Sequence, residues 1–287
     1  MIPASFGYIR ANTVEEAVGF MKNNPDAKIL AGGHSLIPAM KLRLNQPSTL
    51  IDIARIPALN FIRDRGKYIA IGAATTHGTI AEHKTTMMKL PLVAQAAALI
   101  GDVQVRNRGT IGGSMAHNDP ASDWPAVLIA ANATVEVQGP YGEKHIPAEE
   151  FFIDFFTTKL EPSEIITEVH IPEPVSTTLR YAYEKFVQPA SRFAVVACAV
   201  QLVMDGAIIQ DARVAFNGVS NCAYRAKAVE NELIGKPLSD ETIAAAASMA
   251  TYDATLIMVD HFAGEDYRRH LAQLYCKKAL SYCVAGC

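Results

Sequence analysis

The chain has 287 residues, of which 50% are hydrophobic and 19% are charged, and its formal net charge is −3. This composition is typical of a globular protein and excludes a disordered one, and the length is sufficient for two domains with a substantial core. Charges of both signs are interspersed without a basic face, so nucleic acid is not expected as a partner. No apolar run approaches the ~20 residues that a membrane span needs, and the stretch MIPASFGYIRANT lacks the pattern of a secretory signal.

The cysteines are odd in number and widely scattered. They suggest neither a disulfide framework nor a CxxC metal site, and they do not supply the spaced thiolates that an iron–sulfur cluster usually requires. The sequence therefore predicts a protein of the reducing cytoplasm. The five residues are Cys198, Cys222, Cys276, Cys283 and Cys287.

In chain order, the first elements predicted are short helices and strands. Thr13 with Glu16 three residues later is a capping-box pattern, which predicts the start of a helix. The stretch AKILAGG predicts a buried strand that runs into a Gly-Gly turn. Strands are then expected over 49–54 and in a hairpin over 61–73, and helices over 36–44, near Ile80 and over 91–100.

The second half of the chain continues this mixture. A hairpin is predicted over 134–146, a strand over 164–172, a long hairpin over 194–220 with its turn at Asp205-Gly206, and helices over 226–234, 240–249 and 265–281. The proline-rich stretch from Pro172 to Ser176 is typical of a linker, which predicts domains at 1–175 and 176–287. Because strands and helices do not alternate regularly, an α+β architecture is expected rather than a doubly wound sheet.

Two glycine-rich bends stand out, LAGGHSLIP and VRNRGTIGGSMAHNDPASD. Glycine lets a ligand reach the main-chain N–H groups, and successive N–H groups before a helix form an anion cradle. Two such bends, at Gly32-Gly33 and Gly109–Gly113, would hold a diphosphate from two sides. Neither bend matches GxxxxGK[ST] or GxGxxG, and the alternative is that both are turns without a ligand.

Each polar residue beside these bends has two possible roles. Asp123 precedes the apolar stretch WPAVLIA, so it either caps a helix or accepts hydrogen bonds from ligand hydroxyls. His34 and His117 either offer a ring nitrogen to a ligand or are structural. The sequence contains no HExxH-like spacing that would predict a metal site. Ser35 has no general base at the spacing of a hydrolase motif, so it is not expected to be a catalytic nucleophile.

Taken together, AGGHSLIPAMKLRL, GAATTH, VRNRGTIGGSMAHNDPASDWPAVLIA, EIITEVHIP and YEKF resemble the FAD-binding medium subunits of the molybdenum hydroxylases. This family includes the flavoprotein subunit of carbon monoxide dehydrogenase and the FAD domain of xanthine dehydrogenase. The similarity extends over nearly the whole chain. It implies a FAD domain of the vanillyl-alcohol-oxidase (PCMH) type with two α+β subdomains, followed by a smaller domain with a three-stranded antiparallel sheet and a helical bundle.

The resemblance also implies which residues contact FAD. The first bend would contribute Ala31, Gly32, Gly33, His34, Ser35 and Leu36, and the second Thr110, Ile111, Gly112, Gly113 and Ser114, with His117 beside them. Asp123 matches an acidic residue that binds toward the ribose or ribityl part. Lys185 matches a lysine near the flavin ring, and Phe193 would cover a ring face. The alternatives are that Lys185 is a solvated lysine on a strand and that Phe193 is a phenylalanine of the core.

By the same resemblance, the chain would transfer electrons within a molybdenum hydroxylase. A large subunit with the molybdopterin cofactor would oxidise the substrate, and a small subunit with [2Fe–2S] clusters would pass electrons to FAD, in a dimer of heterotrimers. Two other functions are alternatives: a self-sufficient flavin oxidoreductase of the same fold, and a non-enzymatic nucleotide-binding subunit. The substrate and the final electron acceptor stay open.

Overall fold

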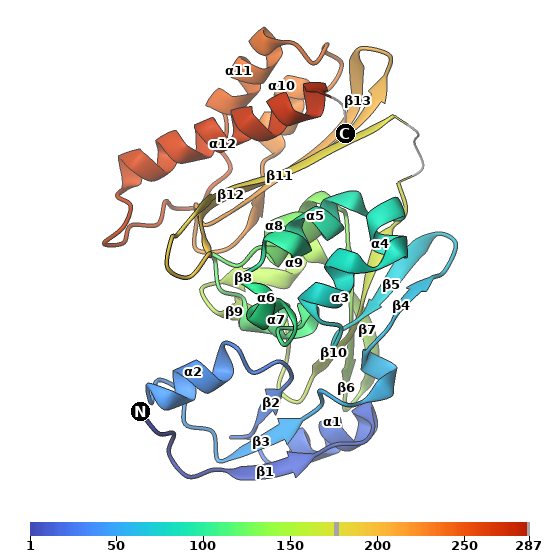
Figure 1. The fold of residues 1–287 in the computed structure, drawn as a ribbon, viewed down its shortest axis with the longest axis vertical. Coiled ribbons are helices and arrows are strands. Elements are labelled where there is room, and N and C mark those ends of the chain that lie inside the picture. The colour runs from blue at the N-terminus through green and yellow to red at the C-terminus, as the bar shows by residue number, and fades with distance from the viewer. Residues whose placement is uncertain (175–177, 286–287) are drawn as a thin grey trace.

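The computed structural model describes residues 1–174 and 178–285. It is a stack of three layers, with the N-terminal sheet at the bottom of Figure 1, a second sheet with its helices in the middle and the C-terminal domain at the top. Helices and strands are mixed without a repeating βαβ pattern, which confirms the predicted α+β class. The predicted boundary at 175/176 and the end of the predicted linker, Val175 and Ser176, lie outside the described residues.

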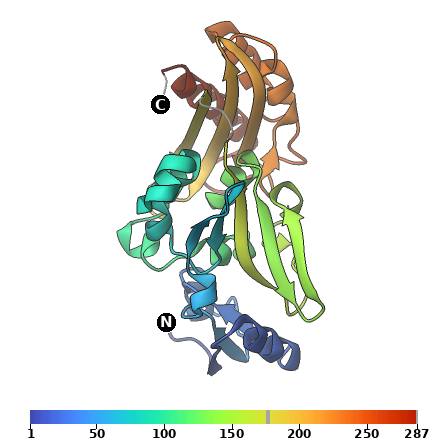
Figure 2. The same ribbon diagram turned by 90° about the vertical axis from the view of Figure 1, so that its right-hand side faces the viewer.

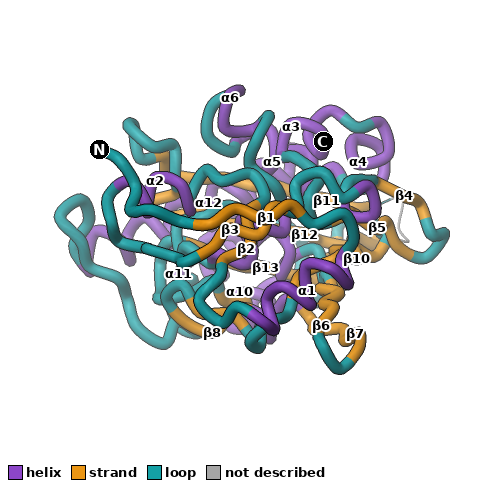
Figure 3. Tube along the Cα trace, turned by 90° about the horizontal axis from the view of Figure 1, so that it is seen from below, coloured by secondary structure: helices purple, strands orange, loops and turns teal. Residues whose placement is uncertain are grey.

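The bottom layer is a small sheet of three parallel strands in the order β1-β3-β2. Seen from below, α1 and α2 lie on either side of it (Figure 3). Thr13 caps α1 by accepting a hydrogen bond from the Glu16 amide at 3.1 Å, while the Glu16 carboxylate accepts from the Asn12 amide. The elements are β1 (Gly7–Arg10), α1 (Val14–Asn23), β2 (Lys28–Leu30), α2 (Leu36–Lys41), β3 (Thr49–Asp52) and a 3-10 turn η1 (Pro57–Leu59).

The middle layer is a five-stranded sheet in the order β4-β5-β10-β6-β7, with helices packed on one face (Figure 2). Its apolar side chains alternate with polar ones, so that Val135, Val137 and Val169 join the helices in one core. A two-stranded ribbon lies beside it. The elements are β4 (Ile62–Asp64), β5 (Tyr68–Gly72), α3 (His77–Glu82), α4 (Lys84–Lys89), α5 (Pro91–Leu99), α6 (Val103–Arg106), α7 (Ile111–His117), α8 (Trp124–Ala130), β6 (Thr134–Gly139), β7 (Gly142–Pro147), α9 (Ala148–Phe151), β8 (Phe152–Asp154), β9 (Thr157–Thr158) and β10 (Ile165–Pro172).

The top layer is an antiparallel sheet in the order β11-β12-β13-β14, whose three long strands match the expected sheet and whose fourth has two residues. One face packs on α5 and α8 of the middle layer, and the other on α10 and α12. Tyr183, Ala197 and Ala215 of this sheet therefore belong to the core of the middle layer. The elements are β11 (Leu179–Val187), β12 (Ala194–Asp205), β13 (Ile208–Asn217), β14 (Tyr224–Arg225), α10 (Lys227–Leu233), α11 (Asp240–Ser248) and α12 (Glu265–Ala285).

Most of the predicted helices and strands are found within a few residues of their predicted bounds. The helix expected over 36–44 ends earlier, at Lys41, and Arg43 beyond it has a left-handed backbone with φ 61°. The second glycine bend holds a helix that the sequence did not predict, α7, with Gly112 and Gly113 in its first turn. None of the helices within the described ranges has the length and apolar character needed to cross a bilayer.

Candidate functional site

The first glycine bend presents a row of unpaired main-chain amides. Within the described part of the chain, none of the amides from Ala31 to Leu36 donates a hydrogen bond to another protein group. Gly33 has φ +76°, a left-handed conformation that glycine adopts without strain and that turns the chain toward α2. Each residue of the bend is at least partly exposed. Consecutive N–H groups that are open to solvent and lack partners are the feature that binds anions.

The second bend lies directly against the first. A Cβ atom added to Gly32 would stand 2.2 Å from the Arg108 carbonyl oxygen and 2.8 Å from the Gly109 Cα. A Cβ on Gly113 would lie 3.8 Å from the Cβ of Ala31. The two bends therefore form one continuous surface, because glycine at position 32 lets their backbones touch.

Three consecutive amides of the second bend, those of Ile111 to Gly113, are already paired, in contrast with the expectation of a second open cradle. Ile111 donates to the Thr75 carbonyl at 3.1 Å, and Gly112 donates to the Ala73 carbonyl at 2.9 Å. The amide of Gly113 donates to the Thr110 hydroxyl at 3.2 Å, which is the N-cap of α7. The consecutive open amides thus come from the first bend, while the second supports it and exposes Gly113.

Asp123, Tyr183 and Lys185 meet where the segment after α7 packs against β11. Oδ1 of Asp123 accepts hydrogen bonds from the Tyr183 hydroxyl at 2.5 Å and from Nζ of Lys185 at 2.9 Å. Nζ of Lys185 also donates to the carbonyls of Leu99 at 2.8 Å and Arg192 at 3.0 Å, so its three hydrogens are engaged. Both charged side chains are buried. Burial raises the pKa of Asp123, and the Lys185 ammonium and the Tyr183 hydroxyl oppose that rise.

Asp123 is therefore not a side-chain cap of α8, although it stands at the position before Trp124. It is part of a buried ion pair that joins the middle layer to β11. Lys185 is not a solvated strand lysine, which was the alternative reading of YEKF.

Phe193 lies on the turn between β11 and β12, next to the carbonyl that binds Lys185. Its side chain is 38% exposed, so it is not a core phenylalanine. The following residue, Ala194, donates from its amide to the Ala121 carbonyl at 3.1 Å. This bond holds the turn beside the segment that contains Asp123.

The remaining predicted residues line the bends or α7. His34 and Ser35 lie in the first bend, with the His34 side chain exposed, and Leu36 begins α2. Ser114 lies half-exposed in α7. His117, at the end of α7, has its ring against that of Phe156 at a centroid distance of 5.1 Å, and burial lowers its pKa.

His77 supports the second bend, a role that no sequence pattern predicts. Its backbone amide donates to the Gly109 carbonyl at 3.0 Å, and a Cβ on Gly109 would stand 2.7 Å from its Nε2 atom. Its Nδ1 accepts a hydrogen bond from the Trp124 indole at 3.1 Å. Burial lowers the pKa of His77 to about 3.

This pKa predicts that acid destabilises the protein. Below pH ~6.5 the unfolded chain binds a proton at His77 that the folded protein excludes, so the free energy of unfolding falls by ~1.4 kcal/mol per pH unit until the folded-state pKa is reached. Replacing His77 with glutamine, which can still accept from Trp124, should remove this contribution. In urea unfolding at pH 6.5 and pH 5, the wild type should lose about 2 kcal/mol more than the variant. Equal losses would show that His77 does not titrate in this way.

Comparisons with known proteins show the family of the chain. Residues 4–174 match the family described as the FAD binding domain in molybdopterin dehydrogenase, and residues 181–283 match the CO dehydrogenase flavoprotein C-terminal domain. The carbon monoxide dehydrogenase medium chain of Hydrogenophaga pseudoflava is 40% identical, with 100% of both chains covered. The glyceraldehyde dehydrogenase medium chain of Sulfolobus acidocaldarius is 36% identical, over 97% of this chain and 98% of the relative.

Solved structures show the same fold. A chain of the Hydrogenophaga pseudoflava carbon monoxide dehydrogenase superimposes with a TM-score of 0.97 at 41% identity and covers 100% of both chains. A chain of quinoline 2-oxidoreductase from Pseudomonas putida 86 gives 0.94 at 29% identity, over 100% of this chain and 99% of that one. The chain therefore belongs to the family of FAD-binding medium subunits of the molybdenum-containing dehydrogenases and hydroxylases.

Proposed function

We propose that this chain is the electron-transfer subunit of a molybdenum hydroxylase complex, and that it takes electrons from iron–sulfur clusters on a partner and passes them to an external acceptor. The observation that carries the proposal is the row of unpaired amides from Ala31 to Leu36. A diphosphate group would satisfy these donors, which otherwise have only water as a partner.

The arrangement around α7 supports an extended dinucleotide. The amides of the first bend stand at the start of α7. Asp123 follows α7 in the chain, on the segment to which the Phe193 turn is joined through the Ala194 amide and the Ala121 carbonyl. Seven helical residues span about 10 Å. The diphosphate would therefore bind between the Ala31–Leu36 amides and the Thr110–Ser114 turn, with the rest of FAD directed along α7 toward the C-terminal sheet.

FAD exchanges one or two electrons, so when bound it connects one-electron clusters with acceptors of either kind. The residues of this chain bind and orient it. The ammonium of Lys185 is held in place by three acceptors, one of which is the Asp123 carboxylate. We propose that this fixed charge, together with the exposed Phe193 ring, lies at the flavin end of the site, where it would favour electron uptake.

The iron–sulfur clusters and the molybdenum cofactor are assigned to partner chains. Among the described cysteines, Cys198, Cys276 and Cys283 are buried in the C-terminal domain and Cys222 is half-buried, and none of these four forms a disulfide. Relatives named as medium chains belong to enzymes with further subunits, so we propose a small iron–sulfur subunit and a large molybdopterin subunit, assembled as a dimer of heterotrimers. Buried or half-buried thiols without a disulfide at Cys198, Cys222 and Cys276 favour a cytoplasmic location.

The substrate pocket is assigned to another chain of the complex. The relatives are named for oxidation of carbon monoxide and glyceraldehyde, and a third, 36% identical, is named for nicotine 6-hydroxylation. The differing names agree with a substrate pocket on another chain.

Affinity purification of the tagged chain from its own cells tests the proposal. We expect a yellow complex with stoichiometric FAD, accompanied by an iron–sulfur protein and a molybdenum protein. The isolated chain should bind FAD without turning over NADPH and an organic substrate. A colourless chain that takes up no FAD would contradict the cofactor assignment. Turnover by the isolated chain would instead favour a self-sufficient flavin oxidoreductase.

A further inference from the structure

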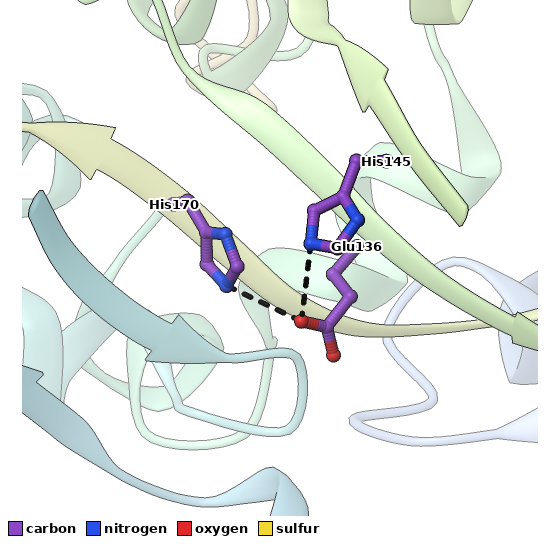
Figure 4. A group of neighbouring side chains, drawn as sticks. All are labelled: Glu136, His145 and His170. Carbon is purple, nitrogen blue, oxygen red and sulfur yellow. Dashed lines mark ion pairs between the residues drawn. The ribbon is translucent and has the colours of Figure 1, made fainter. Parts of the chain in front are cut away.

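Three side chains converge on the sheet face of the middle layer that is turned away from its helices. Glu136 on β6, His145 on β7 and His170 on β10 point toward one another (Figure 4). The sheet register explains this convergence, because Glu136 pairs directly with His145 across one ladder and with Glu168 across the other. Since alternate residues share a face, His170 lies on the same side as Glu168.

The ligand atoms have the spacing of a metal site. Nε2 of His145 is 3.5 Å and Nε2 of His170 is 3.4 Å from the same oxygen, Oε2 of Glu136. The three atoms lie within 4.8 Å of one another. Ligands bound tetrahedrally at 2.0–2.1 Å stand about 3.3–3.4 Å apart, so the two separations from Glu136 match those of a zinc site.

The surroundings favour a cation. The Glu136 carboxylate is oriented through its other oxygen, which accepts a hydrogen bond from the Thr167 hydroxyl at 2.7 Å. Oε2 of Glu168 lies 3.0 Å from Nε2 of His170 and can provide a fourth ligand. Glu143 adds a third carboxylate, 3.7 Å from Nε2 of His145. The ring of His170 is held against that of Tyr68 at a centroid distance of 4.4 Å.

The site is accessible and preformed at once. The His145 side chain is 47% exposed, whereas those of His170 and Glu136 are 13% and 16% exposed. An ion can therefore enter from solvent and meet two ligands that are already packed in position. Such support of ligating groups by hydrogen bonds and packing is a regular feature of metal sites.

We propose that Glu136, His145 and His170 bind a divalent transition metal of the zinc class, with Glu168 or water as the fourth ligand. Mixed imidazole and carboxylate ligands suit Zn²⁺ and Co²⁺ better than Ca²⁺ or Mg²⁺. The bound ion would join β6, β7 and β10, and thus fasten the outer hairpin to the centre of the sheet. The site uses none of the residues assigned to FAD.

Titration of the FAD-loaded protein with ZnCl₂ and, separately, with CoCl₂ tests this site. We expect saturable Zn²⁺ binding by calorimetry and a rise in Tm on zinc addition. Bound Co²⁺ should show the visible bands of a four- or five-coordinate ion without sulfur-to-cobalt charge transfer, which excludes the cysteines as ligands. Glu136→Gln, which preserves the shape of the side chain, and the double variant His145→Ala/His170→Ala should each weaken zinc binding roughly tenfold or more.

His261→Ala is the matched control, because it removes an exposed histidine outside the cluster. It should bind zinc like the wild type. Flavin content and circular dichroism of each variant establish that it is folded. Zinc affinity that is unchanged in the folded double variant, or absent in the wild type, would overturn the proposal and leave the three residues as an ion-pair cluster.

Discussion

Replacing Gly32 with alanine is expected to give a protein that is purified without FAD. The new Cβ would stand 2.2 Å from the Arg108 carbonyl oxygen and 2.8 Å from the Gly109 Cα, and both are backbone atoms that cannot rotate away. The two bends must separate, at a cost of about 1–3 kcal/mol for such overpacking, and the row of amides loses its support. The measurement is flavin absorbance relative to protein, with circular dichroism to establish that the chain is folded.

Gly19→Ala is the matched control for this substitution. Gly19 lies inside α1, and a Cβ there meets nothing within 4 Å. It should retain all of its FAD and gain up to about 1 kcal/mol of stability from the better helix propensity of alanine. Full flavin content in Gly32→Ala would show that close contact of the bends is not needed for binding.

Replacing Lys185 with methionine should have the largest effect on stability among the site residues. The substitution removes the partner of a buried carboxylate, Asp123, and leaves the carbonyls of Leu99 and Arg192 without their donor. Breaking a buried ion pair from one side costs about 3–5 kcal/mol. The free energy of unfolding in urea should fall by that amount, and the flavin midpoint potential, measured on the same sample, should also fall if the lysine charge acts on the ring.

The double variant Lys185→Met/Asp123→Asn should recover part of the loss, because it removes the unpaired buried charge. Lys236→Met serves as a control. It breaks an exposed pair with Glu232 on the surface and should change stability by less than about 1 kcal/mol. A Lys185→Met protein as stable as this control would rule out an energetic role for the buried pair.

The sequence predicted what depends on short-range patterns. Hairpins such as 194–220 were evident because alternating apolar residues flank Asp205-Gly206, and the structure has β12 and β13 on either side of that turn. The first glycine bend was evident because two glycines after a buried strand are costly unless the backbone needs them, and Gly33 has the left-handed φ that such a turn requires.

Features that depend on long-range packing were not predictable in this way. Two glycines argue against a helix, yet α7 forms because Thr110 caps it and Ala73 accepts the Gly112 amide. The same contacts pair amides of the second bend that its glycine-rich sequence predicted to be open. The roles of His77 and Tyr183 were missed because their partners lie far away in the chain.

The Glu136, His145 and His170 cluster was hidden for a related reason. Its members come from three strands, so no spacing in the sequence identifies them. They become neighbours through the register of two ladders, one of which carries a β-bulge between Ile166 and Glu168. A bulge changes which residues face each other, and sequence patterns seldom reveal where one occurs.

The C-terminal sheet packs against α5 and α8 on one face and against α10 and α12 on the other. If this sheet moved away from the middle layer, Tyr183 would become exposed and the core that the two layers share would lose apolar contacts. In the electron-transfer role proposed above, this packing would keep the C-terminal sheet at a fixed position relative to the middle layer, so the distance from a bound flavin to a cluster on a partner would be set by assembly rather than by a hinge movement.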